Sequence, residues 1–219
     1  MITVILLCWK RFEHFEDILK FWLNQDEVKQ IIVFDNSGQF KTELPVQVVN
    51  ISENLGPSVR LMAAYYAKYD YIIFCDDDLS PRKGIIDDLI AHFDNNRIVG
   101  IMGKRFTGET YVGSPTLDGR KLKKPVEVDY VPYNLCLTHR DNCLVDIRKC
   151  PDWKVDDFWW EEELKRANPR ISLWVAPTKN FAFYPESSDK HAICKNPAVI
   201  EAREEYFKKW VKGKNEIHH

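Results

Sequence analysis

The first half of the chain alternates short apolar runs with segments whose apolar residues recur at helical spacing. This alternation is typical of βαβ units stacked around a mostly parallel sheet, with helices on its faces. The run at 71–75 is apolar on both faces, so we expect it at the centre of the sheet. The pattern predicts strands at 3–7, 31–34, 46–51, 71–75 and 98–102, and helices at 15–23, 57–68 and 84–93.

The second half is less regular. A segment rich in Gly, Lys, Arg and Thr favours a mobile loop at 103–124. A chain of 219 residues suits one domain better than two, so we expect a single α/β domain over residues 1–219. The remaining predicted elements are strands at 126–137 and 171–175, a helix at 156–167, and a charged amphipathic helix at 197–212.

Composition and charge narrow the class of protein. Hydrophobic residues make up 45% of the sequence, which argues against disorder, and a net charge of -2 gives no basic field for nucleic acid. No apolar run reaches the roughly 20 residues that a membrane span needs. The six cysteines lack CxxC spacing, which favours reduced thiols over a zinc site or disulfide framework. We therefore expect a cytoplasmic monomer, and we exclude the His218-His219 pair because it is typical of a purification tag.

Polar residues follow several of the predicted strands directly. Ligands of a parallel α/β sheet bind outside the carboxyl ends of its strands, so these residues are the first candidates for a site. The polar strand ends are Cys8-Trp9-Lys10-Arg11, Asp35-Asn36-Ser37, Asn54-Leu55-Gly56 and Asp76-Asp77-Asp78.

The Asp76-Asp77-Asp78 triplet carries the strongest chemical signal. Three adjacent carboxylates repel one another unless a cation or several hydrogen-bond donors neutralise them. Hard oxygen ligands favour Mg²⁺ or Mn²⁺, and such ions keep open positions for phosphate oxygens. The alternative is a solvated acidic turn that caps the next helix.

In order and spacing, these strand ends resemble the nucleotide-binding half of the GT-A glycosyltransferases. The resemblance covers about residues 1–93. The runs Cys8-Trp9-Lys10-Arg11 and Asp76-Asp77-Asp78 are similar both to the large inverting family 2 and to the exostosin type, and the small single-domain form is similar to glycosyltransferase domains of large algal viruses. The resemblance implies a GT-A fold with a donor-binding half at 1–102 and an acceptor half at 103–219, in the host cytoplasm if the protein is viral.

The resemblance also implies how the donor binds. Asp35 would bind the uracil ring, although an Asp at this position also forms turns. Arg60, at the start of a helix, would face the diphosphate, unless it is an ordinary exposed charge. The other implied donor contacts are Leu7, Cys8, Trp9 and Arg11 around the uridine, Asn54 and Gly56 at the base and diphosphate, Asp76 or Asp77 at the ribose or sugar, and Lys190 at the leaving diphosphate.

Asp78, with Asp76, would bind the metal in such an enzyme. Some GT-A members use an additional histidine from the C-terminal side as a ligand, and His191 is the candidate here. A lone histidine in a polar loop is also typical of an ordinary surface residue.

Inverting transfer needs a carboxylate that takes the proton from the acceptor hydroxyl. Family 2 enzymes place this base in an acidic pair at the start of a helix, which corresponds here to Asp156-Asp157, with Asp157 as the expected base. Trp159-Trp160 departs from the family pattern, so Glu161 or Glu162 stays open. Alternatively, Asp156 caps the helix and 161–163 form a solvated face.

Aromatic residues are candidates for stacking on sugar rings, although the same residues fill cores. They are Tyr130, Tyr133, Trp153, Trp159 and Trp160.

The sequence thus predicts a Mn²⁺- or Mg²⁺-dependent transferase that moves a hexosyl or deoxyhexosyl group from a UDP-sugar to a carbohydrate acceptor, with inversion. Two other classes stay open. Asp76-Asp77-Asp78-Leu79-Ser80 also fits the nucleophile motif of haloacid dehalogenase-type phosphatases, although it follows two complete βα units rather than the first strand. A non-catalytic carbohydrate-binding module would explain the aromatic residues but gives the triplet no role.

Overall fold

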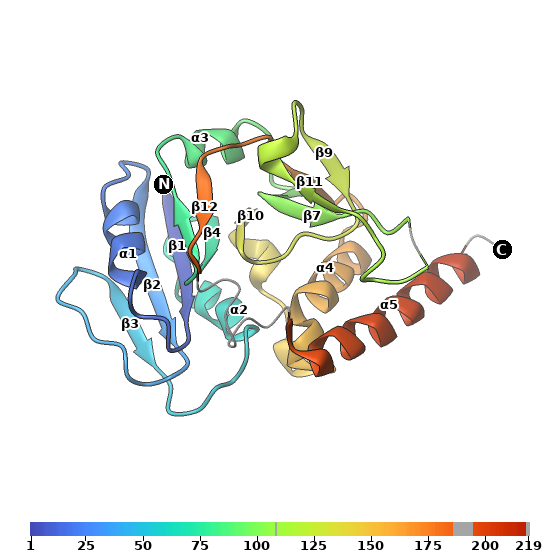
Figure 1. The fold of residues 1–219 in the computed structure, drawn as a ribbon, viewed down its shortest axis with the longest axis horizontal. Helices are drawn as coiled ribbons and strands as arrows, with labels where there is room; N and C mark the ends of the chain where they lie inside the picture. Colours follow the sequence, from blue (N-terminus) through green and yellow to red (C-terminus); the bar gives the residue numbers. More distant parts are fainter. Residues whose placement is uncertain (108, 186–194, 218–219) are drawn as a thin grey trace.

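The computed structural model describes residues 1–107, 109–185 and 195–217 and shows a layered α/β fold (Figure 1). The main sheet of this described part has eight strands in the order β3-β2-β1-β4-β10-β6-β11-β9. They are β1 (Ile2–Cys8), β2 (Val28–Asp35), β3 (Gln47–Asn50), β4 (Tyr71–Asp76), β6 (Arg97–Gly100), β9 (Val126–Val128), β10 (Leu135–His139) and β11 (Ser172–Val175).

The expected mostly parallel sheet is confirmed. The pairs β1–β2, β1–β4, β2–β3 and β6–β11 are parallel. Only β10 and β9 run antiparallel to their neighbours within this sheet. As a result, the carboxyl ends of β1, β2 and β4 meet at one edge, with Cys8 opposite Asp35 and Leu7 opposite Asp76.

Two short antiparallel pairs lie beside this edge. β5 (Leu79–Pro81) pairs with β12 (Phe181–Phe183), and β7 (Met102–Lys104) pairs with β8 (Thr116–Asp118). The amide of Tyr184 also donates to the Asp78 carbonyl at 2.9 Å. These bonds fix the backbone that directly follows the aspartate triplet.

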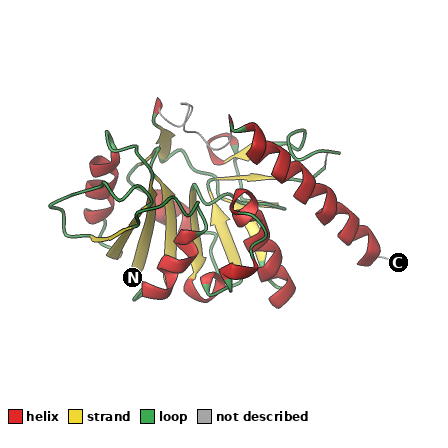
Figure 2. Ribbon diagram, turned by 90° about the horizontal axis from the view of Figure 1, so that it is seen from below, coloured by secondary structure: helices red, strands yellow, loops and turns green. Residues whose placement is uncertain are grey.

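Helices cover both faces of the sheet, because the strand side chains alternate between two cores. Val4, Leu6 and Ile73 pack with α1 (Phe15–Leu23) and α3 (Ile85–Ile90). Ile5 and Phe74 pack with α2 (Val59–Ala63) and α4 (Asp156–Ala167). Figures 1 and 2 place α5 (Pro197–Ile217) at the side of the molecule opposite α1.

Short 3₁₀ helices complete the described chain. They are η1 (Ala64–Tyr66), η2 (Gly119–Lys121), η3 (Arg140–Cys143), η4 (Ile147–Lys149) and η5 (Trp153–Val155). None of the described helices is long and apolar enough to span a membrane. The described cysteines, which exclude Cys194, are all free thiols.

The predicted single strand at 126–137 is wrong. The chain leaves the sheet after Val128 and returns at Leu135, so that the two ends belong to β9 and β10. Pro132 has no N–H for a ladder bond, and the Val131 amide donates instead to the Glu161 carboxylate at 2.9 Å. The interruption places residues 129–134 beside the aspartate triplet.

The expectation of a loop throughout 103–124 is also wrong. β8 and η2 lie within this segment. The carboxylate of Glu204 on α5 accepts hydrogen bonds from the amides of Tyr111 and Val112 at 2.8 and 2.7 Å. The helix therefore holds this part of the chain in place, a long-range contact that local composition does not reveal.

Candidate active site

A cleft of about 820 Å³ opens at the carboxyl ends of β1, β2 and β4. One wall comes from these strand ends and α2, and the opposite wall from the 130–134 segment, the start of α4 and α5. The cleft lining includes Trp9, Arg11, Asn36, Asn54, Gly56, Arg60, Asp76, Asp77, Asp78, Tyr111, Tyr130, Tyr133, Trp153, Asp156, Asp157 and Arg203. Residues from both halves of the chain thus meet in one cavity.

Asn36 is held on the cleft wall by its amide. The Asn36 Nδ2 group donates to the Gly56 carbonyl at 2.9 Å and to Asn54 Oδ1 at 3.3 Å. The Asn36 Oδ1 atom is buried and has no hydrogen-bond partner among the described residues. A buried carbonyl oxygen without a partner is costly, so this atom is suited to accept an N–H from a ligand.

Gly56 lets Trp153 approach closely. Gly56 has a φ of +79°, and a Cβ added there would lie 2.9 Å from the Cβ of Trp153. A residue with a side chain would be strained and would displace the indole. Trp153 itself is 41% exposed at the mouth of the cleft, so one face of the cavity near Asn36 is aromatic.

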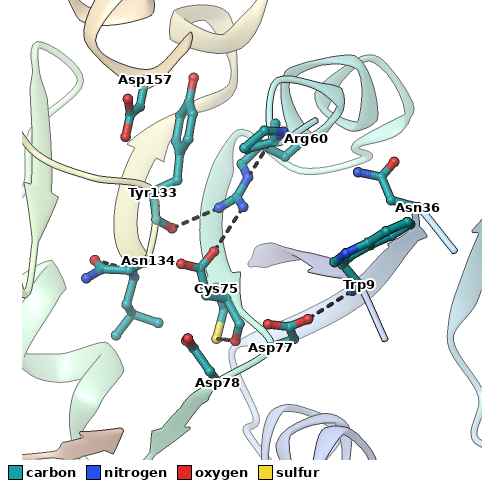
Figure 3. A network of polar contacts seen from close by, with 12 residues as sticks. Trp9, Asn36, Arg60, Cys75, Asp77, Asp78, Tyr133, Asn134 and Asp157 are labelled. Carbon is teal, nitrogen blue, oxygen red and sulfur yellow. Dashed lines mark hydrogen bonds and ion pairs between the residues drawn. The ribbon is translucent and has the colours of Figure 1, made fainter. Parts of the chain in front are cut away.

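Arg60 is the buried cation of the cleft (Figure 3). Its side chain is 4% exposed, and Nη2 pairs with Asp76 Oδ1 at 2.9 Å. The remaining donors reach the carbonyls of Pro57 and Tyr133, both at 3.2 Å. The alternative of an exposed helix charge is therefore wrong, and the expected contact of Arg60 with a diphosphate stays a prediction.

Arg11 holds the other two aspartates of the triplet. Arg11 Nη1 lies 3.1 Å from Asp77 Oδ1 and 2.8 Å from Asp78 Oδ2. The Trp9 amide donates to Asp77 Oδ2 at 2.9 Å (Figure 3). These contacts fix the triplet against the end of β1, as the parallel register of β1 and β4 requires.

Two carboxyl groups of the triplet are nevertheless shifted towards their protonated forms. Burial, which outweighs the nearby Arg11, raises the pKa of Asp77 to about 6. Burial and the neighbouring Asp76 and Asp77 raise the pKa of Asp78 to about 7. A further cation near these oxygens would favour their charged forms.

The triplet therefore fits a divalent cation in both charge and ligand type, since carboxylate oxygens are hard ligands. Among the described residues, no group of three or more His, Cys, Asp or Glu side chains is arranged as a complete metal site. His191 and Lys190, the predicted extra ligand and diphosphate contact, lie outside the described residues.

Two predicted donor contacts are not part of the cleft lining. Asp35 is fully buried, and its carboxylate accepts bonds from the Ser37 amide at 2.9 Å and the Phe40 amide at 2.7 Å. This is the turn-forming arrangement, and it is the next residue, Asn36, that lines the cleft. Cys8 is fully buried too, and its carbonyl accepts from the Asn36 amide at 3.0 Å, so it contributes through its backbone.

Asp156 and Asp157 begin α4 and both line the cleft, although their surroundings differ. Asp157 accepts from Arg203 Nη2 at 2.9 and 3.1 Å and from the Tyr130 hydroxyl. Asp156 is 1% exposed, and its Oδ2 has no hydrogen-bond partner among the described residues. Burial and the adjacent Asp157 raise the pKa of Asp156 well above its usual range.

Glu161 lies one turn further along α4 and does not line the cleft. Its Oε1 accepts the Val131 amide, and burial raises the pKa of the carboxyl well above its usual range. Its contacts show a structural role: Glu161 holds the backbone of the 129–134 segment.

The candidate aromatic residues separate into two groups. Tyr130, Tyr133 and Trp153 line the cleft, whereas Trp159 and Trp160 belong to the core beneath α4. The Trp160 indole donates to the Asn142 carbonyl at 2.6 Å, which satisfies its buried N–H.

Arg203 on α5 is the main functional candidate that the sequence interpretation missed. That interpretation treated the tail as a charged helix with a buried apolar side, and it assigned no role to this arginine. Val199, Arg203 and Phe207 are spaced four residues apart and therefore share one face of the helix. A charged residue in the middle of a buried stripe is the signal that identifies Arg203.

The parallel strands β1, β2 and β4, the antiparallel β10 and the cleft at the strand ends are the features of a GT-A fold. The profile of glycosyl transferase family 2 matches residues 3–148, and the chain belongs to this family. A search of curated protein sequences gave no significant match.

Solved structures with the same fold share little sequence with this chain. TarS of S. aureus is 16% identical with a TM-score of 0.57, and the match covers 88% of this chain and 38% of TarS. Glucosyl-3-phosphoglycerate synthase from Mycobacterium tuberculosis, solved with phosphoglyceric acid, is 14% identical with a TM-score of 0.57, over 93% of this chain and 80% of the synthase. A mycobacterial protein is 14% identical with a TM-score of 0.51, over 80% of this chain and 65% of that protein. This chain thus spans well under half of TarS, and the likeness shows the fold alone.

Proposed function

We propose that this protein transfers a hexosyl or deoxyhexosyl group from a UDP-sugar to a carbohydrate hydroxyl, with a divalent cation at the triplet. One observation carries the proposal. A single cleft is lined by the Asp76-Asp77-Asp78 triplet, by the Asp156-Asp157 pair and by Arg60, which pairs with Asp76. In this proposal residues 1–102 bind the donor and residues 103–219 bind the acceptor.

The donor would extend from Asn36 to the triplet. The free Asn36 Oδ1 suits the N–H of a uracil ring, and Trp153 offers an aromatic surface beside it. Arg60 and Arg11 place two guanidinium groups near the position of the diphosphate. A divalent cation held by Asp78 and Asp76 would supply Lewis-acid stabilisation of the departing diphosphate.

Asp156 is the better candidate for the base. The sequence favours Asp157, but both oxygens of Asp157 are already bonded to Arg203, and Tyr130 adds a further bond. The Asp156 carboxylate would take the acceptor hydroxyl proton while the acceptor oxygen bonds to the anomeric carbon. The bond from that carbon to the diphosphate breaks in the same step, its electrons leave with UDP, and the single displacement inverts the anomeric centre.

The first test is release of UDP from a panel of UDP-hexoses and UDP-deoxyhexoses, with Mn²⁺, with Mg²⁺ and with a chelator, and with simple sugars as acceptors. We expect UDP release in either metal and none in the chelator. No release from any UDP-sugar of the panel would refute the uridine assignment, and equal release in the chelator would refute the role of the cation.

Asp78→Ala should weaken Mn²⁺ binding in the presence of UDP. We expect a loss of about 10- to 100-fold, because an anionic oxygen ligand is removed while the fold is kept. Electron paramagnetic resonance of free Mn²⁺ measures this directly. Asp87→Ala, an exposed carboxylate on α3, is the matched control and should bind Mn²⁺ as the wild type does. Unchanged Mn²⁺ binding by Asp78→Ala would contradict the metal assignment.

A further inference from the structure

Arg203 joins three parts of the acceptor side. Its Nη1 donates to the Tyr111 hydroxyl at 2.8 Å and to the Tyr130 hydroxyl at 2.7 Å, and its Nε donates to the Lys154 carbonyl at 3.0 Å. Its Nη2 contacts both oxygens of Asp157. Every nitrogen of this guanidinium is therefore engaged, and the group connects α5 with α4 and with the 103–134 region.

This cluster lies beyond the residues that the family profile matches. The match ends at residue 148, whereas Asp157 and Arg203 lie beyond it. The ion pair is largely buried, with side-chain exposures of 15% for Arg203 and 7% for Asp157. A desolvated arginine–carboxylate pair with several donors has a fixed geometry, so Asp157 is held in one orientation.

The two carboxyl groups at the start of α4 thus have separate roles. Asp157 is occupied by Arg203 and Tyr130, whereas Asp156 faces the cleft with an unbonded oxygen. We propose that Arg203 is a positioning residue that holds Asp157 in one orientation, so that Asp156 is the carboxylate presented to the acceptor hydroxyl. The inference rests on the proposed transfer reaction and adds a function for α5 within it.

Removing the charge of Arg203 should also raise the pKa of Asp156. Asp157 is the anion that raises the pKa of Asp156, and Arg60 and Arg203 are the cations that lower it. The titratable or charged groups that face Asp156 from the surrounding elements are Asp157, Arg60, Arg203, Tyr133 and Cys150. Because Arg203 is one of the cations that lower the pKa of Asp156, its removal should move the ionisation of Asp156 to higher pH.

The test is the pH dependence of kcat for Arg203→Gln, with Arg203→Lys and Arg166→Gln as comparisons. The base acts in its ionised form, so kcat rises with pH through the pKa of Asp156. For Arg203→Gln we expect kcat at neutral pH to fall about 100-fold, at the low end of what a general base contributes. The rising limb of the plot of kcat against pH should move to higher pH. The KM for the UDP-sugar should not change.

The two comparison variants distinguish this positioning role from a purely structural one. Arg203→Lys keeps the charge and should return the rising limb towards its wild-type position. Arg166→Gln removes an arginine that pairs with Glu162 and Glu163 on the exposed side of α4, and it should leave both kcat and the limb unchanged. Wild-type kcat and an unmoved limb in Arg203→Gln would overturn the inference.

A double variant keeps the test decisive if Arg203→Gln does not fold. Arg203→Gln with Asp157→Asn buries no unpaired charge and should fold. We expect its kcat to equal that of Asp157→Asn alone, because Arg203 acts through Asp157. A further large drop in the double variant would overturn the inference, whereas a wild type that transfers no sugar would instead refute the proposed function.

Discussion

Asp156→Asn should reduce kcat for sugar transfer by about 10²- to 10⁴-fold, the range that a general base contributes. Asn keeps the size of the side chain but cannot accept the acceptor proton. Asp156 Oδ2 has no hydrogen-bond partner among the described residues, so the substitution breaks no bond from this oxygen. Binding of UDP should be unchanged, because the donor contacts lie at the ends of β1, β2 and β4.

Asp157→Asn is the matched comparison at the adjacent position. It disturbs the pair with Arg203 and should reduce kcat by less than Asp156→Asn. Kinetics at saturating donor and acceptor, together with UDP calorimetry, distinguish the two variants. The reverse order of effects would return the base to Asp157, as the sequence predicts.

Arg60→Met should lower the free energy of unfolding by about 3 to 5 kcal/mol and remove donor binding. Breaking a buried ion pair on one side leaves an uncompensated charge, and here it would leave Asp76 beside Asp77 and Asp78. Methionine also loses the bonds to the Pro57 and Tyr133 carbonyls. Urea denaturation measures the stability, and UDP titration below the denaturation range measures the binding.

Arg148→Met is the control for this loss. Arg148 pairs with Asp146 but is 86% exposed, so water screens the pair and its removal should change the stability little. Arg60→Met combined with Asp76→Asn should regain part of the stability and none of the UDP binding. If Arg60→Met is as stable as Arg148→Met, the account of Arg60 as the buried counter-charge of the triplet is wrong.

The strand ends that line the cleft could be predicted because each of them is encoded by a short local stretch of sequence. Each polar group follows an apolar strand directly, and the parallel order of β1, β2 and β4 brings the strand ends together without any knowledge of side-chain packing. The positions of Trp9, Asn54, Gly56 and the triplet on the cleft wall follow from this register.

At a strand end, however, a difference of one position in the sequence changes which side chain lines the cleft. Asp35 and Asn36 are neighbours, and the sequence interpretation chose Asp35 because the resemblance to GT-A enzymes implies a carboxylate at this strand end. In the structure the Asp35 carboxylate closes its own turn through the Ser37 and Phe40 amides, which leaves the amide of Asn36 at the cleft. A turn that an Asp side chain forms with its own backbone competes with ligand binding.

The wall of the cleft from the second half of the chain depends on contacts between distant segments. These contacts cannot be inferred from local sequence patterns. Arg203 meets Asp157 across 46 residues, and Glu204 meets Tyr111 across 93. Neither pair follows from helical periodicity alone, although a charge between Val199 and Phe207 on one helix face indicates a buried partner. The interruption at 129–134 likewise depends on Glu161, a residue of α4.

Calorimetric titration of UDP into the protein, with and without Mn²⁺, tests the central claim most directly, because it requires neither the correct sugar nor the correct acceptor. The account predicts micromolar binding that depends on Mn²⁺ and is lost in Asp78→Ala. Absence of UDP binding in both conditions would contradict the assignment of this cleft to a uridine nucleotide.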